Sequence, residues 1–477
     1  MGYHDIYKSC QDDPEAYWLE QSKAIDWEQA PRQALFEKGN DLYEWFADAK
    51  VNACYNAVDR HVENGRADQV AIIHDSPITG TQTKITFAEL QTRVAAVAGV
   101  LQANGVGKGD RVIIYMPMVP EALEAMLACA RIGAVHSVVF GGFASNELAV
   151  RINDCTPKAI IAASCGLEPS RVVAYKPLLD GAIEQADHKP DFCLILQRKQ
   201  APCDLIPGRD LDWHDAQEGT PPSPCIAVEG NHPAYILYTS GTTGAPKGVV
   251  RQTAGHLVAL NWTMKNIYNV DPGDVFWAAS DVGWVVGHSY ICYGPLVHGN
   301  TTVVFEGKPV GTPDAGTFWR VISEHNVRSF FTAPTAIRAV KREDPKGEEI
   351  GKYDISCLRA LYLAGERADP DTVIWAQEKL GKPVYDHWWQ TETGYTIVGN
   401  PAGLEALPVK VGSPTVPMPG YDVQILNEAG EHARPYRDQA APAPRHAANL
   451  VECRRAVSQK LPHDLSGILR NRRCGKD

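Results

Sequence analysis

Short apolar runs alternate with longer segments of helical periodicity through most of this chain, and that rhythm limits the folds open to it. Residues 70–74 precede the helix-like stretch 86–104, and residues 111–116 precede the stretch 119–131. Alternation of this kind predicts βα units and largely parallel sheets. The pattern continues with apolar runs at 135–140, 159–163, 192–197, 234–238, 275–279, 302–305, 329–332 and 358–363, and with a helical stretch at 144–154. We therefore predict an α/β fold.

Length and charge restrict the class of protein further. The chain has 477 residues, enough for about three domain-sized units. Its formal net charge of −11 opposes broad attraction to nucleic acid or to an anionic membrane surface, so small-molecule chemistry is favoured. No apolar run approaches the roughly eighteen residues of a membrane span, and the N-terminus lacks the apolar core of a signal peptide.

The number and spacing of the cysteines also restrict the class of protein. Twelve of them are scattered from Cys10 to Cys474 without a CxxC pair. This pattern indicates neither a zinc knuckle nor a disulfide framework, and it is typical of a reducing compartment. We expect a cytoplasmic protein.

A Gly/Thr-rich segment with one lysine, YTSGTTGAPKGV at residues 238–249, directly follows the apolar run 234–237. Glycines let a backbone approach an anion closely, hydroxyls donate hydrogen bonds, and a lysine adds charge. The residues with these properties are Gly241, Gly244, Gly248, Thr239, Ser240, Thr242, Thr243 and Lys247. The spacing differs from that of a Walker loop. The segment predicts a phosphate-binding loop and ATP chemistry.

Two more polar segments stand where predicted strands end. The tripeptide Gly-Glu-Arg at 365–367 follows the run 358–363, and Asp-His-Trp at 386–388 follows Val384. Ligands of parallel sheets collect beyond the carboxyl ends of the strands. We therefore expect these two segments and the phosphate-binding loop to converge on one crevice.

The loop at 238–249 and the segment YDHWWQTETG at 385–394 together resemble the acyl-adenylate-forming superfamily, and the doubled tryptophan makes short-chain acyl-CoA synthetases, of the propionyl- or acetyl-CoA synthetase kind, look closest. Residues 280–290, 332–338 and 14–18 extend the likeness from the N-terminus to about residue 430. The resemblance implies a large N-terminal adenylation domain of luciferase type, with two βα-layered sheets plus a small β-rich piece. The expected parts are a packing segment at 1–60 and an AMP-binding domain at 61–425.

In such enzymes a carboxylate attacks the α-phosphorus of ATP, pyrophosphate leaves, and a thiol captures the acyl-adenylate. The resemblance implies ATP, Mg²⁺ and coenzyme A as ligands. It implies Lys247, Thr243 and Glu392 as catalytic residues, with Glu392 also as the metal ligand, because Mg²⁺ takes oxygen ligands and usually one or two carboxylates. The implied nucleotide site comprises Thr239, Ser240, Gly241, Thr242, Thr243, Gly244, Lys247, Gly365, Glu366, Arg367, Asp386, His387, Trp388, Trp389, Gln390 and Thr391. Two simpler interpretations stay open, with Lys247 as a solvated loop lysine and Glu366 with Arg367 as a surface ion pair.

The acyl pocket is implied to contain Trp389, whose rigid indole leaves little room for a long chain. Val285, Val286 and Ala364 stand where acetate-using relatives typically carry Val, Thr and Val. A buried methylene is worth about 0.8 kcal/mol, and a pocket rarely discriminates over one methylene by more than about 1–3 kcal/mol. We expect propionate to be preferred and acetate to be tolerated, with acetate as the alternative substrate.

Contacts with coenzyme A are implied for Arg171, Gly142 and Phe143. Arg171 matches a position that holds the 3′-phosphate, and a planar guanidinium suits that group. A solvent-facing helix arginine is the other interpretation, and Glu168 replaces a second arginine found in some relatives. We expect small-molecule partners only, with no nucleic acid and no membrane; a homo-oligomer stays open.

The sequence changes character at about residue 432. Residues 432–477 hold eight arginines and two lysines against three aspartates and one glutamate, with no strand alternation and no sustained helical stripe. The mobile C-terminal domain that the resemblance implies is not recognisable there. We expect an aberrant basic tail, from a shifted reading frame or from divergence. The main hypothesis is an ATP-dependent short-chain acyl-CoA ligase; the rival is a remnant that binds nucleotide or acyl-adenylate without turnover.

Overall fold

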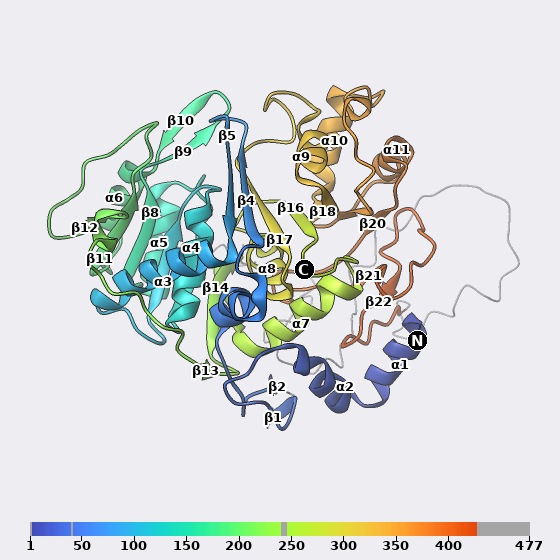
Figure 1. Ribbon diagram of the computed structural model, residues 1–477, viewed down its shortest axis with the longest axis horizontal. Coiled ribbons are helices and arrows are strands. Elements are labelled where there is room, and N and C mark those ends of the chain that lie inside the picture. Colours follow the sequence, from blue (N-terminus) through green and yellow to red (C-terminus); the bar gives the residue numbers. More distant parts are fainter. Residues whose placement is uncertain (1, 40–41, 240–245, 427–477) are drawn as a thin grey trace, which may run out of the picture.

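The computed structural model describes residues 2–39, 42–239 and 246–426, and its centre is a pair of seven-stranded sheets (Figure 1). The first sheet has the strand order β12-β11-β8-β6-β7-β14-β15. Its strands are β6 (Arg111–Tyr115), β7 (Val135–Val138), β8 (Ala159–Ala163), β11 (Phe192–Leu196), β12 (Asp210–Asp212), β14 (Pro233–Thr239) and β15 (Lys247–Gln252). Neighbouring strands are parallel except for β14 and β15, which form an antiparallel hairpin.

The second sheet repeats this plan, with the order β20-β19-β18-β16-β17-β4-β5. Its strands are β4 (Val70–Ser76), β5 (Thr81–Thr86), β16 (Val275–Ala279), β17 (Thr301–Phe305), β18 (Val327–Thr332), β19 (Ala360–Leu363) and β20 (Val384–Asp386). Here β4 and β5 form the antiparallel pair at one edge, and the other neighbours are parallel. The predicted α/β fold with largely parallel sheets is confirmed.

Helices cover the sheets on both faces. They are α3 (Phe87–Ala103), α4 (Pro120–Arg131), α5 (Ser145–Cys155), α6 (Tyr175–Gln185), α7 (Thr253–Asn266), α8 (Gly294–His298), α9 (Thr317–His325), α10 (Pro334–Glu343) and α11 (Pro370–Leu380). The helical stretches expected at 86–104, 119–131 and 144–154 are confirmed as α3, α4 and α5. A capping box between Thr86 and Glu89 starts α3, because each side chain accepts a hydrogen bond from the other residue's backbone N–H.

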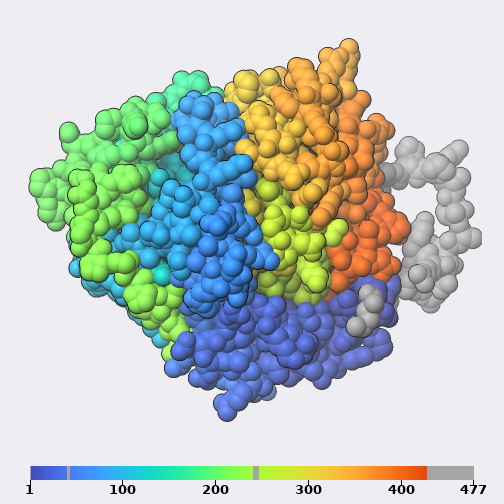
Figure 2. Space-filling view, viewed as in Figure 1, coloured from blue at the N-terminus to red at the C-terminus, as the bar shows by residue number. Residues whose placement is uncertain are grey.

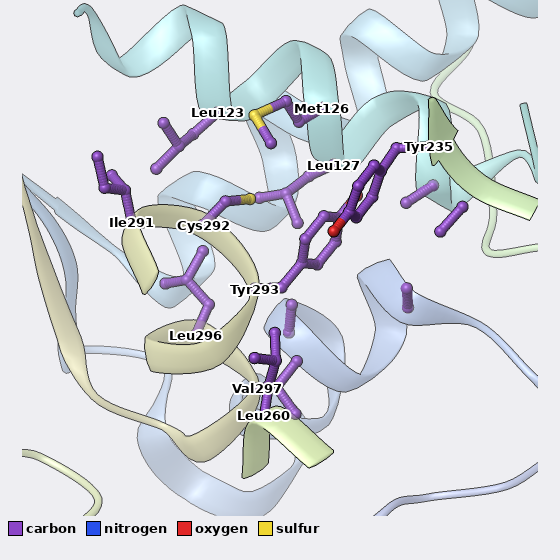
Figure 3. Packing of buried hydrophobic residues seen from close by; sticks show 14 of the residues in the cluster. Leu123, Met126, Leu127, Tyr235, Leu260, Ile291, Cys292, Tyr293, Leu296 and Val297 are labelled. Atoms are coloured by element: carbon purple, nitrogen blue, oxygen red, sulfur yellow. The ribbon is translucent and has the colours of Figure 1, made fainter. Parts of the chain in front are cut away.

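Strand alternation divides the core into clusters. In the second sheet Phe276 and Phe331 belong to the largest cluster, whereas their neighbours Trp277 and Phe330 belong to another. Successive side chains of a strand point to opposite faces, so each sheet buries both of its faces. The largest cluster joins the inner faces of both sheets through α3, α4, α7 and α8. Figure 3 shows part of it, where Leu123, Met126 and Leu127 of α4 lie on the side of Cys292 and Tyr293, and Val297 lies beside Leu260.

The N-terminal segment lies against the rest of the molecule, along the lower side of the space-filling view (Figure 2). It contains α1 (Tyr3–Asp12), α2 (Pro14–Gln21) and the hairpin of β1 (Leu35–Gly39) and β2 (Leu42–Trp45). The Tyr3 hydroxyl donates to the Pro417 carbonyl at 2.7 Å, and the Tyr7 hydroxyl donates to the Tyr421 carbonyl at 2.8 Å. These bonds tie the beginning of the chain to the end of its described part.

The remaining strands are short and lie outside the two sheets. They are β3 (Lys50–Val51) with β13 (Val228–Glu229), β9 (Cys165–Glu168) with β10 (Arg171–Ala174), and β21 (Val398–Gly399) with β22 (Val416–Pro417). Among the helices of residues 2–426, none is both long enough and apolar enough to cross a membrane. The basic segment that we expect at 432–477 lies outside the described residues, as does the centre of the phosphate-binding loop at 240–245.

Candidate active site

A pocket of about 430 Å³ opens at the carboxyl ends of β19 and β20. These strands are parallel neighbours, and Leu363 pairs with Asp386, so the residues after both strands meet at one edge of the sheet. Gly365 has a φ of +102°, a conformation that a side chain rarely adopts. The lining residues are Gly365, Glu366, Arg367, Asp386, His387, Trp388, Trp389, Gly412 and Pro414. The expected meeting of segments 365–367 and 386–388 is therefore found, and Gly412 and Pro414 are additions. The third segment of that prediction, the phosphate-binding loop, has its centre at 240–245 outside the described residues.

His387 lines this pocket with its imidazole held on both sides. Its Nδ1 is 2.6 Å from the Leu363 carbonyl, and its Nε2 is 3.0 Å from the Tyr268 hydroxyl. The carbonyl can only accept, so Nδ1–H donates to it and Nε2 accepts from the tyrosine. Burial lowers the pKa of His387 to about 4, which keeps the ring neutral. The side chain thus fixes the ends of β19 and β20 relative to each other.

Acidic groups at the pocket differ in their partners. Burial raises the pKa of Asp386 to about 6, while hydrogen bonds from His387 and Ala368 and the charge of Arg367 act in the opposite direction. Glu366 forms an ion pair with Arg338 at 2.7 Å, and Arg338 also reaches Asp369 at 3.2 Å. The surface ion pair considered from sequence therefore exists with a different arginine, from α10.

The turn at residues 390–394 is held by a buried arginine that sequence analysis did not identify. Arg251 of β15 is only 3% exposed, and its guanidinium donates to the carbonyls of Thr391, Glu392 and Thr393 at 2.6, 3.1 and 3.4 Å. The Ser289 hydroxyl donates to the Gly394 carbonyl at 2.8 Å. The side chains of Thr391 and Glu392 stay half-buried on this fixed turn.

The same strand carries the lysine of the phosphate-binding loop. Lys247 was expected within a loop, but it is the first residue of β15 and pairs with Thr239 of β14. Residues at i, i+2 and i+4 share one face of a strand, so Lys247 lies on the face of Arg251, four residues and about 13 Å along the strand. Its side chain is exposed. Ser240, Gly241, Thr242, Thr243 and Gly244 lie outside the described residues, within the connection of this hairpin.

The residues expected around the acyl group pack together. Ala364 and Trp389 are buried in the largest core cluster, and Val285 and Val286 are half-buried against it. The Trp389 ring meets Tyr290 edge to face, with centroids 5.4 Å apart. The indole is therefore immobilised by aromatic packing, as a pocket wall requires.

A second cavity, of about 270 Å³, lies between the two sheets. Gly142 and Arg171 line it, together with Glu168, Asp281, Glu306 and Lys308. Arg171 begins the exposed strand β10, so the helix interpretation of this residue is wrong. Burial raises the pKa of Asp281 to about 6, and Glu306 is bound by Arg198 at 2.7 and 2.9 Å.

Phe143 has other contacts. The described residues that line the second cavity do not include it. Its carbonyl accepts a hydrogen bond from the Tyr115 hydroxyl at 2.8 Å, and the Arg151 guanidinium lies 4.7 Å from its ring centroid. Phe143 therefore packs beside the cavity wall rather than in it.

Two largely parallel sheets, a pocket beyond β19 and β20, and a β14–β15 hairpin that Arg251 ties to residues 391–393 define the arrangement to be compared with known enzymes. The chain belongs to the family of AMP-binding enzymes, whose profile matches residues 58–439. Residues 3–57 match the acetyl-coenzyme A synthetase N-terminus.

Curated relatives narrow the comparison to short-chain acyl-CoA synthetases. The chain is 50% identical to acyl-CoA synthetase short-chain family member 3, mitochondrial, of Homo sapiens over 429 residues, which cover 89% of this chain and 62% of the relative. It is 44% identical to the propionate–CoA ligase of Escherichia coli over 430 residues, 90% of this chain and 68% of that enzyme. An uncharacterized protein of Pseudomonas aeruginosa is 54% identical over 418 residues, 88% and 67% of the two chains. The chain thus spans about two thirds or less of the length of these relatives.

Proposed function

We propose that this chain activates a short-chain carboxylate with ATP, as an acid–thiol ligase that forms acyl-CoA, AMP and pyrophosphate through an acyl-adenylate. The observation that carries the proposal is the pocket beyond β19 and β20, where residues 365–367 and 386–389 meet. Such a reaction needs two anions held together with their charge compensated, and it needs no nucleophile from the protein. The named activities of the relatives agree with this chemistry.

The nucleotide would be held between the hairpin and the fixed turn. Residues 365–367 and 386–389 would contact adenine and ribose, and the hydroxyls and backbone of residues 239–244 would receive the β- and γ-phosphates. Lys247 projects on the face of β15 that also carries Arg251, and Arg251 fixes the carbonyls of Thr391 and Glu392. That arrangement supports a phosphate contact for Lys247 and an α-phosphate contact for Thr391.

The half-buried carboxylate of Glu392 fits a magnesium ion, because Mg²⁺ selects oxygen ligands and usually few carboxylates. The ion would supply charge compensation on the phosphates when ATP is bound. Coenzyme A would enter the cavity between the sheets, where Arg171 and Gly142 line the wall and Lys308 adds a second positive charge. Phe143 would act from beside this wall, through its packing on Arg151.

The acyl group would end against Trp389, with Ala364, Val285 and Val286 beside it. Propionate is the proposed preferred acid, with acetate tolerated. Ala364 is 4% exposed and sits in the packed cluster that contains Trp389, so its size affects the space at this wall. Ala364→Val should shift the ratio of kcat/KM values from propionate toward acetate by roughly tenfold, because one methylene is worth at most about 1–3 kcal/mol of discrimination. Val411→Ala, at an exposed position, is a control that should leave the ratio unchanged. An unchanged ratio in Ala364→Val would refute the acyl pocket.

The direct test is ATP–pyrophosphate exchange by the purified 477-residue chain with acetate, propionate or butyrate, followed by thioester formation with coenzyme A. Exchange that depends on propionate supports the proposed adenylation, and thioester formation supports the whole ligase. Exchange without thioester restricts the function to the first half-reaction.

A second candidate is a protein that binds nucleotide or acyl-adenylate without turnover. It would use the same pocket beyond β19 and β20, since binding alone needs the lining residues and no chemical step. It predicts ATP binding by calorimetry with no exchange for any of the three acids. Exchange with any of them would eliminate it.

A further inference from the structure

Three parts of the chain meet at a buried junction that contains none of the residues of the proposed site. They are residues 52–59, the end of α4 and the loop before β13. The Asn52 side-chain amide donates to the carbonyls of Ala130, Arg131 and Ile226, at 3.0, 2.9 and 2.7 Å. The Arg131 Nε donates to the Ser223 carbonyl at 2.6 Å. These bonds fix the two chain segments that carry Cys54 and Cys225.

The two sulfurs of this junction lie close together. The Sγ atoms of Cys54 and Cys225 and a carboxylate oxygen of Asp59 are all within 4.8 Å of one another. Cys225 Sγ is 3.5 Å from Asp59 Oδ2, and Cys54 Sγ is 3.9 Å from it. A disulfide needs a separation of about 2.05 Å, so the sulfurs must approach further. Cys225 lies in a loop without regular secondary structure, where rotation of its side chain can bring this about.

A guanidinium completes the junction. Arg131 Nη1 donates to Asp59 Oδ2 at 2.7 Å and to Cys54 Sγ at 3.5 Å. A neighbouring cation stabilises a thiolate, which is the reactive form of cysteine. The hydrogen bond with Cys54, burial and the charge of Asp59 raise the pKa of the Cys225 thiol, while the charge of Arg131 acts in the opposite direction. The same positive charge opposes a metal ion at these ligands, because the cation position is already taken.

Access also distinguishes this pair. Cys54 is fully buried, whereas Cys225 is half-buried and can meet a small oxidant from solvent. Cys203 and Cys357 are half-buried too, but among the described residues neither belongs to a cluster of this kind. Cys54 and Cys225 therefore combine proximity with charged neighbours, and Cys225 alone of the two is accessible from solvent.

We propose that Cys54 and Cys225 are a redox pair that forms a reversible intramolecular disulfide when the protein meets hydrogen peroxide. One thiol first releases its proton, and the resulting thiolate attacks hydrogen peroxide. The O–O bond breaks, so that a sulfenic acid and hydroxide form, and the released proton converts the hydroxide to water. The second sulfur then displaces the sulfenic oxygen as a second water and the S–S bond forms. Two thiols lose two electrons in total, and one peroxide is reduced to two waters. The inference does not depend on the proposed ligase activity.

The experiment treats the reduced full-length chain with hydrogen peroxide, blocks remaining thiols with N-ethylmaleimide and digests without reductant. Mass spectrometry should find a linked peptide pair containing Cys54 and Cys225, which dithiothreitol removes. The pair should persist in Cys203→Ser, the matched control, and be lost in Cys225→Ser. Recovery of Cys225 only as an alkylated or over-oxidised peptide would overturn the proposal, as would a link to another cysteine, Cys453 and Cys474 included.

Thermal unfolding gives a second measurement, in which the oxidised and reduced forms of the native sequence are compared. The new bond closes a long loop, so oxidation should raise the Tm of the native sequence by about 2–5 °C, reversibly with dithiothreitol. Cys203→Ser should show the same rise and Cys225→Ser none. If zinc ions instead raise the Tm of the reduced chain and that rise is lost in Cys225→Ser, the junction is a metal site and the redox proposal is wrong.

Discussion

The two sheets each end on an antiparallel edge strand of six residues, and the two edges differ in what they face. Residues 81–84 of β5 are exposed, and Lys84 among them is a charged group on an open edge, as natural sheets use against edge-to-edge pairing. On β15 the burial alternates, and Arg251 is buried against the carbonyls of residues 391–393. The edge at β5 only ends the second sheet, whereas the edge at β15 connects the first sheet to the candidate active site.

The difference shows where an edge strand acquires a function. Both strands are held by a hairpin to their sheet, so backbone pairing does not distinguish them. The difference comes from the side chain of Arg251 on β15, which turns inward and donates hydrogen bonds to the carbonyls of residues 391–393. Without Arg251 these carbonyls would lack a donor. Position in a sheet is therefore a weaker guide to function than the partner of each buried polar group.

The largest expected effect is from removing Arg251. Arg251→Ala leaves three carbonyls without their donor and opens a space in the packed interior, so we expect ~2–4 kcal/mol of destabilisation. The released turn should also lower the rate of ATP–pyrophosphate exchange at least ~100-fold, since positioned groups carry that much of the reaction. The checks are denaturant unfolding and exchange assays. Lys84→Ala is the matched change on the other edge and should stay within about 0.5 kcal/mol with normal exchange; similar losses in both variants would erase the contrast between the edges.

Lys247 tests whether the functional edge also contacts phosphate. It is exposed, so Lys247→Ala should change the free energy of unfolding by less than about 0.5 kcal/mol. Exchange should fall by ~10–100-fold, because a point charge on the leaving pyrophosphate is lost. The fall is measured as the rate of ATP–pyrophosphate exchange at saturating ATP, and Lys84→Ala again serves as the control. Full activity in Lys247→Ala would leave it a solvated lysine.

Much of the scaffold could be predicted from sequence, for a physical reason. Strands buried on both faces are short continuous apolar runs, and the runs at 111–116, 159–163 and 275–279 all correspond to strands. The two edge strands β5 and β15 were not identified, because half-exposed polar residues do not form such runs. Arg171 was weighed as a helix residue because a four-residue hairpin strand has no periodicity to read.

The candidate site could be predicted only where it is local in sequence. The meeting of residues 365–367 with 386–389 followed from the rule that parallel strands end at one edge. Arg251 carries no motif of its own, and its partners lie about 140 residues away, so only the fold reveals its burial. His387 was correctly placed at the pocket, but its bond to Tyr268, 119 residues distant, follows from no local pattern.

Gly394 offers a smaller test of the same turn. It has a φ of +76°, and an added Cβ would lie 2.8 Å from Cζ of Arg251. Gly394→Ala should cost ~1–3 kcal/mol, from the left-handed backbone and from displacement of the guanidinium. Gly80, in the hairpin of β4 and β5, has a φ of +68° with no described atom within 4 Å of the added Cβ. Gly80→Ala should cost only the backbone part, about 1 kcal/mol. Equal costs in denaturant unfolding would show that contact with Arg251 adds nothing.

The smallest expected effect concerns pH, and it contrasts Asp386 at one edge of the second sheet with Asp75 near the other. Burial raises the pKa of Asp386 from its ordinary value of 3.8 to about 6. For Asp75 burial acts in the same direction, but hydrogen bonds from His325 and Arg320 outweigh it and lower the pKa to about 2.

Opposite pH dependences follow from these opposite shifts. A raised carboxyl pKa means that the fold is favoured by the protonated form, so the contribution of Asp386 is present below pH 3.8 and is lost as pH rises through about 6. The contribution of Asp75 is present above pH 3.8 and is lost as pH falls toward 2. Asp386→Asn should therefore raise stability at pH 7 by on the order of 1 kcal/mol and flatten its change between pH 4 and 6. Asp75→Asn should lower stability at pH 7, because Arg320 and His325 lose a charged partner. Urea unfolding at each pH measures both slopes, and a loss of stability at pH 7 in Asp386→Asn would mean that the carboxylate, rather than the neutral acid, is the form that the crevice stabilises.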